Sequence, residues 1–504
     1  MSEEVSVKAD VPDPAVPVSD PNRFRALFVI AIAQLMIVLD ASIVNLAIPS
    51  AQADLGIAPQ DVQWVVTAYT LAFGGFLLLG GRIADFVGRK KAFLIGLLGF
   101  AAASALGGVA MNAQLLFGAR ALQGVFAALL APAALALITV TFHDPKERAK
   151  AFGVFGAISG GGAAIGLLLG GVLTEYFSWR WCLAVNTPIA ILAALLAVRF
   201  VRESKAHGDT SYDIPGAVTV TGGLLALVYG FTKAAPAGYE DSAHWTDAST
   251  LVWFALAAVL LTAFFVIESR SAHPLLPLRV IRNSNRAGAY ISSLMVGAGM
   301  FAMFLFLGIF LQTILGYSPV RAGFAFLPFS VGIILGAGVA ANLLPKVGPR
   351  PLMIPGLIAG GVGMLLLAQL QADSGYLSHV LPAMVIMSLG MAFVFIPTAS
   401  VALHAIDQHD AGVASAMINT SQQVGGSLGT ALMNTVAVTA TSSFLVANAA
   451  AGPAVMPEAL THGFTRGFYV GAALLFAAAV VVFFMIRIGA DAVKEGDEAP
   501  VHIG

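Results

Sequence analysis

Residues 24–49 read FRALFVIAIAQLMIVLDASIVNLAIP, and the only charged side chains in this run are Arg25 and Asp40. A helix needs about 20 apolar residues to cross the roughly 30 Å of hydrocarbon in a bilayer. Similar runs fill most of the 504-residue chain, of which 58% is hydrophobic and 11% charged. Soluble globular proteins carry about 25% charged residues. The chain is therefore predicted to be an all-α integral membrane protein.

Fourteen apolar runs lie between charged residues or Gly and Pro breaks, and each predicts one transmembrane helix. The predicted helices are 24–49, 62–85, 91–111, 113–140, 150–174, 181–201, 214–234, 249–268, 286–315, 320–344, 350–371, 377–404, 410–441 and 463–488.

An internal repeat divides these helices into two sets of six. FVGRKKAFLIGL at 86–97 reappears as KVGPRPLMIPGL at 346–357, each time after the second helix of a set. Two repeated halves are the architecture of many secondary transporters, with the substrate site between them. The predicted domains are a disordered tail (1–22), a first six-helix bundle (23–205), an inserted helix pair (206–282), a second six-helix bundle (283–489) and a second tail (490–504).

The positive charges predict the orientation. If the N-terminus is cytoplasmic and the helices alternate, 21 of the 26 Lys and Arg residues lie inside. Four lie outside, and Arg120 lies within a helix. Cytoplasmic loops of membrane proteins carry such an excess of positive charge. We therefore expect both termini in the cytoplasm and the chain in the cytoplasmic membrane.

Asp40 is the acidic residue that lies deepest in a predicted helix. It is about 24 Å along the first helix, at 1.5 Å per residue. A carboxylate at that depth is costly unless it faces water, forms a pair or takes a proton. Burial favours the neutral form, which suits a group that binds and releases protons. The competing interpretation is a structural Asp that is hydrogen-bonded to neighbouring helices.

Arg120 in the fourth helix is the only basic residue predicted inside the membrane. A buried guanidinium stays charged, so it needs acceptors such as backbone carbonyls or Asp40 itself. Two roles are compatible with this, a part in proton coupling and a clamp between the first and fourth helices.

Two glycine-containing segments are candidate gating elements. Residues 81–91 read GRIADFVGRKK, in which Gly81 and Gly88 permit close approach and a tight turn, while Asp85 could bind a neighbouring helix N-terminus and Arg89 follows. A plain topogenic loop is the alternative. The fifth helix carries a run of glycines that includes Gly166 and Gly170, for which tight packing without a hinge role is equally compatible.

Candidate substrate-binding residues lie in the second half. Phe301 and Gln312 share one face of the ninth helix, and Asn419 and Gln423 are four residues apart in the thirteenth. Apolar walls with a few polar groups suit a lipophilic guest, although Phe-rich faces more often contact lipid. A loop with His404, Asp407, His409 and Asp410 could relay protons but is more simply interpreted as a solvated loop.

The sequence lacks the motifs of several functional classes. The sequence has no Gly-rich nucleotide-binding loop with Lys-Ser/Thr, no metal-ligand cluster and no nucleophile constellation. A net charge of −1 gives no reason to expect nucleic acid as a partner. We therefore expect no enzyme, no catalytic residue, no cofactor and no metal, with the proton gradient as the energy source.

In their order along the chain, four segments resemble the fourteen-helix drug:proton antiporters of the major facilitator superfamily. They are LDASIVNLAIP (39–49), WVVTAYTL (64–71), RALQGVFAA (120–128) and SWRWCLAVNTPIA (178–190), with the 81–91 loop between the second and third. The resemblance implies the major facilitator fold, a proton-linked role for Asp40 and alternating access. Phe86 replaces a basic residue usual in the loop motif, and Leu167 replaces the proline usual after Gly166.

The prediction is proton-coupled efflux of lipophilic or amphiphilic small molecules such as drugs and dyes. Membrane lipid, the substrate and protons are the expected partners, and the chain is expected to act as a monomer. One alternative in the same fold is export of an endogenous lipid or secondary metabolite. A channel or a non-transporting receptor is a more distant alternative, distinguished by unsaturable conductance or by a large soluble domain.

Overall fold

The structure is a computed structural model that describes residues 21–142, 144–205, 213–239, 243–271, 274–404, 406 and 411–490. The described residues form helices and loops, without a strand. The first part of the chain contains α1 (Arg23–Leu55), α2 (Trp64–Val87), α3 (Arg89–Gly108), α4 (Ala113–Thr141), α5 (Pro145–Tyr176), α6 (Trp181–Ala184) and α7 (Asn186–Phe200). Next come α8 (Ile214–Ala234), α9 (Ala248–Arg270) and the short α10 (Leu278–Arg282). The last part contains α11 (Ser284–Ile309), α12 (Pro319–Val347), α13 (Pro349–Leu367), α14 (Leu381–Leu403), α15 (Ala411–Ala447) and α16 (Met456–Met485).

The predicted membrane fold is confirmed. In the described residues, 13 helices are long and apolar enough to cross a bilayer, and α5 adds a further one whose described apolar part is Gly162–Tyr176. The predicted sixth helix is divided at Val185 into α6 and α7, because Pro188 has no N–H to continue the hydrogen-bond ladder. Two π-helical turns, Phe310–Ile314 and Tyr376–Val380, flank α11 and α14.

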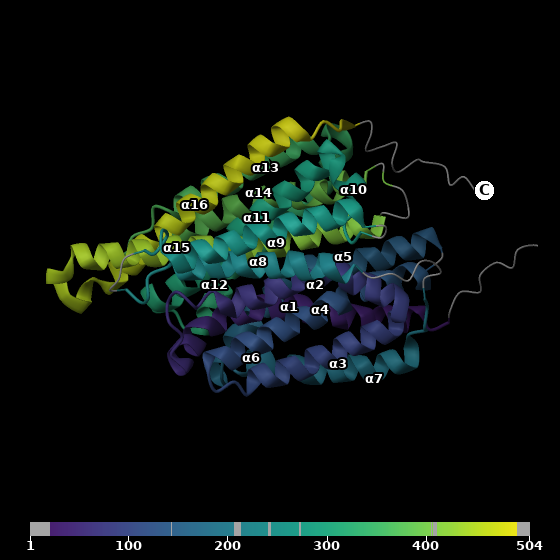
Figure 1. Cartoon of the computed structure of the whole chain (residues 1–504), viewed down its shortest axis with the longest axis horizontal. Helices are drawn as coiled ribbons and strands as arrows, with labels where there is room; N and C mark the ends of the chain where they lie inside the picture. Colours follow the sequence, from purple (N-terminus) through teal and green to yellow (C-terminus); the bar gives the residue numbers. More distant parts are fainter. Residues whose placement is uncertain are drawn as a thin grey trace, which may run out of the picture.

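Some predicted boundaries were wrong by a turn or more. The first helix continues past Pro49 to Leu55, where Gly56 ends it in a left-handed conformation with φ 61°. The fourteenth begins at Met456 rather than at 463, and the thirteenth runs to Ala447 rather than to 441. The α15–α16 hairpin projects beyond its neighbours (Figure 1). The length of the apolar run therefore underestimated the length of these two helices.

The helices group into two bundles that lie side by side (Figure 1). The first bundle contains α1–α7 and the second contains α11–α16. They meet along two seams, one where α2 packs against α15 and one where α5 packs against α12. We call the end at which α1 begins and α16 finishes the inner end, and the opposite end the outer end.

The internal repeat has a structural counterpart. Gly88 separates α2 from α3 with φ 115°, and Gly348 separates α12 from α13 with φ 81°. Each glycine packs against the segment that follows the last helix of its own bundle, at Glu203 and at Ala490 respectively. A positive φ at both turns requires glycine, so the sequence match reflects one backbone geometry used twice.

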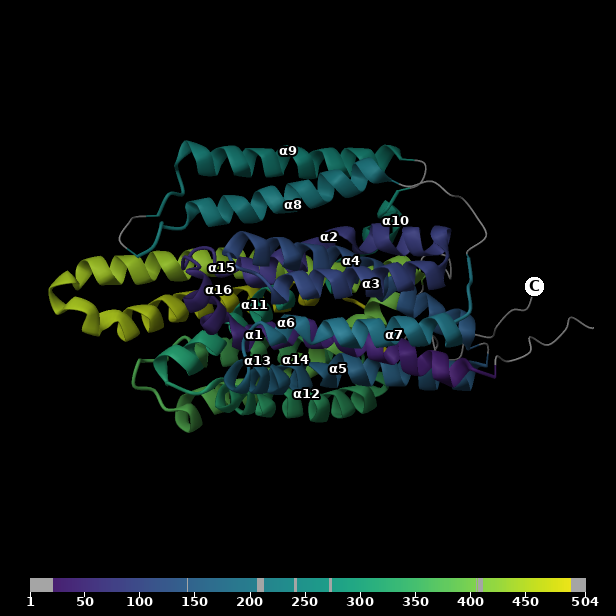
Figure 2. The ribbon, with the colours of Figure 1, turned by 90° about the horizontal axis from the view of Figure 1, so that it is seen from below.

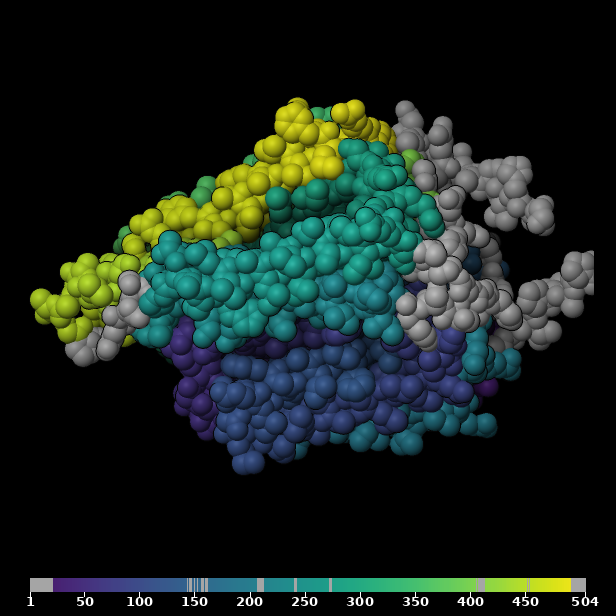
Figure 3. Space-filling model, viewed as in Figure 1, coloured from purple at the N-terminus to yellow at the C-terminus, as the bar shows by residue number. Residues whose placement is uncertain are grey.

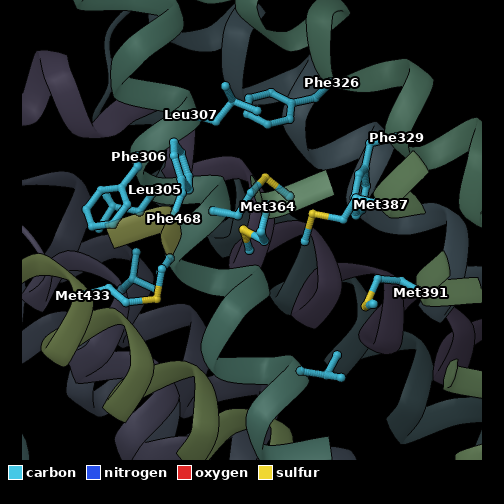
Figure 4. Packing of buried hydrophobic residues seen from close by; sticks show 14 of the residues in the cluster. Leu305, Phe306, Leu307, Phe326, Phe329, Met364, Met387, Met391, Met433 and Phe468 are labelled. Carbon is cyan, nitrogen blue, oxygen red and sulfur yellow. The ribbon is translucent and has the colours of Figure 1, made fainter. Parts of the chain in front are cut away.

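The two bundles pack differently. Small residues dominate the first bundle, where Ala127, Ala128, Ala133 and Ala134 of α4 are completely buried and let backbones approach closely. All six helices of the second bundle contribute large side chains to its core (Figure 4), which contains Leu305, Phe306, Leu307, Phe326, Phe329, Met364, Met387, Met391, Met433 and Phe468. The flexible thioethers of methionine fill irregular gaps between the rings.

The inserted pair, α8 and α9, lies outside both bundles (Figure 2). The space-filling view shows it covering the boundary between them (Figure 3). α8 contacts both α2 and α15. Gln63 donates to Thr232 Oγ1 at 2.9 Å, and Thr435 Oγ1 donates to the Phe231 carbonyl at 2.8 Å. One helix of the pair is thus fastened to both bundles near the outer end.

The topology is testable by cysteine labelling of intact cells. In a Cys182→Ser background, cysteines at Lys90 and Arg350 should resist an impermeant thiol reagent added outside, because both residues lie at inner-end turns. A cysteine at Met111, which is 82% exposed at the outer end of α3, should react. Labelling at position 350 without labelling at position 111 would contradict the assigned orientation.

Candidate functional site

Asp40 lies near the middle of α1 and is completely buried. Three side chains donate hydrogen bonds to its carboxylate from α4 and α7. Arg120 Nη1 donates to Oδ2 at 2.7 Å, while Gln123 Nε2 at 2.9 Å and Asn186 Nδ2 at 2.8 Å donate to Oδ1. These three donors fix the position of the carboxylate between α1, α4 and α7.

Arg120 is held equally tightly, with 1% of its side chain exposed. Its Nε donates to the Val65 carbonyl of α2 at 3.0 Å, and Nη1 also donates to Gln123 Oε1 at 2.9 Å. The guanidinium carbon lies 4.5 Å from the centre of the Tyr69 ring. Arg120 thus pairs with Asp40 and connects α4 to α1 and α2, as the clamp interpretation requires, while its part in proton coupling stays a prediction.

Further buried polar groups extend this cluster. Gln123 Nε2 also donates to Ser104 Oγ of α3 at 2.8 Å. The Tyr69 hydroxyl and Asn186 Oδ1 are buried and have no hydrogen-bond partner among the residues that the structure describes. The cluster therefore keeps unused hydrogen-bonding capacity beside the ion pair.

α5 packs closely against α1 at the level of this cluster. A Cβ added to Gly166 would collide with Ser42 Oγ, and one added to Gly170 would collide with the Ile43 carbonyl. Leu167, which stands in place of the expected proline, is 2% exposed, and its carbonyl lies 3.0 Å from the Cβ position of Gly323 in α12. Both predicted gating glycines of α5 thus lie where α5 touches α1, close to the seam between the bundles.

The inner-end motif is arranged differently from the prediction. Asp85 does not bind the N-terminus of a neighbouring helix here, because its carboxylate pairs with Arg89, four residues on, at 2.9 Å. Glu203, which follows α7, caps α3 instead and accepts hydrogen bonds from the backbone N–H groups of Lys90 and Lys91 at 3.0 and 3.2 Å. Gly81 packs near Pro132 of α4.

The four predicted substrate-binding residues occupy separate positions. The Phe301 ring packs on Gly426 of α15, and Gln423 lies against Gly74 of α2 at the seam. Gln312 donates to the Gly308 carbonyl at 3.2 Å, and Asn419 is exposed. Within the described part of the chain, no hydrogen bond joins these four to one another or to Asp40.

Other candidates lie elsewhere. Asp407, His409 and Asp410 of the suggested relay loop are outside the described residues, whereas the His404 carbonyl accepts a hydrogen bond from Arg286 at 3.5 Å. A cavity of about 380 Å³ opens at the outer end, and is lined by Trp245, Val436, Thr439, Ala440, Arg466 and Val470. None of the predicted substrate-binding residues lines this cavity.

Sequence reasoning missed Gln123, Asn186, Ser104 and Glu203. Gln123 and Asn186 lie in the family-like segments 120–128 and 178–190, and Gln123 is one helical turn from Arg120. That spacing was an available signal, because residues three apart share a helix face. Nothing in the sequence around Glu203 distinguishes it from an ordinary charged loop residue.

The chain is similar to known proteins along most of its length. The sequence profile of the Major Facilitator Superfamily matches residues 30–430. A puromycin resistance protein of Streptomyces alboniger is 46% identical over 96% of this chain and 95% of its own length. A cephamycin export protein of Amycolatopsis lactamdurans is 38% identical over 83% of this chain and 85% of its own length.

The fold also resembles a solved structure. A bacterial homologue of the human lysosomal transporter Spinster, in an inward-facing and unoccupied conformation, superposes with a TM-score of 0.64. The match covers 96% of this chain and 100% of that chain at 15% identity. At that identity, the likeness concerns the fold.

The capping role of Glu203 yields a prediction. Glu203→Ala removes the acceptor for two N–H groups, so the first turn of α3 should lose about 1 kcal/mol, as at other helix caps. Hydrogen–deuterium exchange at Lys90 and Lys91 should then be faster by roughly fivefold. Glu203→Gln keeps one of the two acceptor oxygens, so it should protect only one of the two N–H groups and give an intermediate exchange rate. Unchanged exchange in Glu203→Ala would show that the cap is not important.

Proposed function

Because the chain belongs to the Major Facilitator Superfamily, we propose that it exports lipophilic or amphiphilic small molecules across the cytoplasmic membrane in exchange for protons. Multi-pass membrane architecture and relatives named for antibiotic resistance and export support an efflux transporter rather than an enzyme. Proton coupling, the substrate and the cytoplasmic position of the inner end are parts of the proposal.

The observation that carries proton coupling is the buried pair of Asp40 and Arg120. The guanidinium keeps its charge, so the carboxylate can gain or lose the only mobile proton of this pair. When Asp40 is ionised, three donors hold it against α4 and α7. When a proton binds, the charge attraction to Arg120 is lost, and α1 is held less firmly against α4.

This change can reach the second bundle through α1. One turn beyond Asp40, the Asn45 carbonyl lies 3.5 Å from the Cβ position of Gly308 in α11. Glu175 of α5 accepts a hydrogen bond from the N–H of Val320 at the start of α12, at 2.9 Å. Asn434 of α15 donates to the carbonyls of Pro59 and Gln60, at 3.3 Å. These contacts close the outer end, and we propose that protonation of Asp40 loosens them.

The proposed substrate site lies between the bundles. Phe301 of α11 packs on α15, and Gln423 of α15 lies at the α2–α15 seam. Gln312 lies in the turn that follows α11, and Asn419 lies in α15. The described residues of α11–α15 contain no Asp or Glu. A substrate with two positive charges would find no counter-charge there, so neutral or monocationic compounds are favoured.

The relatives favour a narrower substrate class as a second candidate. Proteins named for puromycin resistance and cephamycin export match most of this chain. Export of a secondary metabolite with antibiotic activity is therefore the specific form of the proposal to test first.

Exchange of Asp40 tests the coupling. Asp40→Asn should abolish gradient-driven export in inverted vesicles, because the amide cannot carry the proton, while substrate binding persists. Asp40→Glu should retain partial export with a shifted pH profile, since a titrating group remains. All three partners of Asp40 are donors, so the amount of folded protein must be matched between variants.

The control for this experiment is Glu458→Gln, the same carboxyl-to-amide change at an exposed site in the first turn of α16. It should export as the wild type does. A purely structural Asp40 predicts the opposite order, with Asn tolerated better than the larger Glu. Normal proton-driven export by Asp40→Asn would remove Asp40 from the coupling step.

Substrate and coupling can be read together in proteoliposomes that hold a pH-sensitive dye. Puromycin and a cephamycin should be tested first, followed by neutral dyes and lipids. A true substrate should move protons in the opposite direction and saturate with concentration. Saturable export that leaves the pH unchanged would contradict proton exchange, and unsaturable conductance would indicate a channel.

A further inference from the structure

Two buried carboxyl groups meet at the inner end of the inserted helix pair. Asp213 precedes α8 and is 6% exposed, and Glu268 lies in the last turn of α9 and is 3% exposed. The Cβ position of Gly216 lies 2.8 Å from Asp213 Oδ2 and 2.9 Å from Glu268 Oε1. Both oxygens therefore lie beside the same point on Gly216, close to each other.

Each carboxyl group uses one oxygen to bind the backbone. Asp213 Oδ1 accepts the N–H of Gly216 at 2.8 Å, which caps α8. Glu268 Oε2 accepts the N–H of Leu276 at 3.0 Å, in the segment that leads to α10. The other two oxygens, Asp213 Oδ2 and Glu268 Oε1, are buried without a donor among the described residues.

No basic side chain among the described residues donates to these two oxygens. The charged residues on the elements around the pair are Lys233 of α8, Arg270 of α9, Arg279 and Arg282 of α10, and Arg82 and Asp85 of α2. An ionised carboxylate can only accept hydrogen bonds, so a hydrogen bond between the two carboxyl groups requires a proton on one of them.

We propose that Asp213 and Glu268 hold one proton between them and form a second proton-binding site, separate from Asp40. Two carboxylates buried this close together repel each other strongly when both are ionised, and one shared proton removes that repulsion. The proton comes from water at the inner end and binds one carboxylate. The resulting O–H donates to the other carboxylate.

This site fastens the connection between the inserted pair and the second bundle. The side chains of Leu275 and Leu276, beside the N–H that Glu268 binds, are 4% and 6% exposed. Loss of the shared proton places two negative charges side by side and releases this segment. The hydrogen bond between the carboxyl groups needs the proton, so its stabilising effect is present at low pH and is lost as the pH rises.

The test is hydrogen–deuterium exchange at Leu276, measured on the full chain in lipid nanodiscs from about pH 5 to about pH 9. The protection of the wild-type Leu276 N–H should fall once the pH is high enough to remove the shared proton. For one proton, the fall is at most about tenfold per pH unit. Glu268→Gln should show protection that changes little with pH, because its Nε2–H can donate to Asp213 in place of the shared proton. Comparing the variants at the same pH removes the intrinsic pH dependence of exchange.

Asp213→Asn is a second variant with the same expectation, and its amide oxygen can still cap α8. The matched control is Asp247→Asn, at the opposite end of α9, where the carboxylate is 54% exposed. It should keep the wild-type profile. Identical pH profiles in wild type and Glu268→Gln would overturn the shared proton. The measurement needs no transport, so its failure is distinct from a failure of the Asp40 mechanism.

Discussion

The packing of the first bundle depends on the buried charge of Arg120. A guanidinium cannot release its proton in a protein, and an uncompensated charge inside a bilayer is very costly. Arg120 therefore binds Asp40, Gln123 and the Val65 carbonyl at once. These contacts require α1, α2 and α4 to approach closely, which the small residues of α4 permit. The buried ion pair and the close packing of α1, α2 and α4 thus depend on each other.

From sequence, Asp40 was one of several possible acceptors for Arg120, and the structure places the two in direct contact. Gln123 could have been proposed from its spacing to Arg120, but Asn186 could not, because a polar residue in an apolar helix can have many different partners. Gly88 and Gly348 were recognisable because a positive φ leaves a residue-type signature. The proximity of Asp213 and Glu268 was not recognisable from sequence, because it depends on how α8 and α9 pack.

The fold itself was largely predictable, because an apolar run of the right length has few alternatives in a bilayer. The failures have two causes. The thirteenth and fourteenth helices were predicted too short where α15 and α16 project beyond the outer end, and apolar length gives no information outside the hydrocarbon. Glu203 was overlooked because its capping partner is more than 100 residues away in the sequence.

The methionine-rich core of the second bundle has a consequence for substitution. In both bundles, a single added carbon at a packed glycine, such as Gly124 or Gly425, would strike the backbone of a neighbouring helix. In the second, methionine side chains surround the seam-facing helices. Cores of similar-sized apolar residues tolerate exchange at a cost usually below about 1.5 kcal/mol. The packed glycines therefore restrict substitution in both bundles, whereas the methionine-rich core of the second accepts changes of side-chain shape.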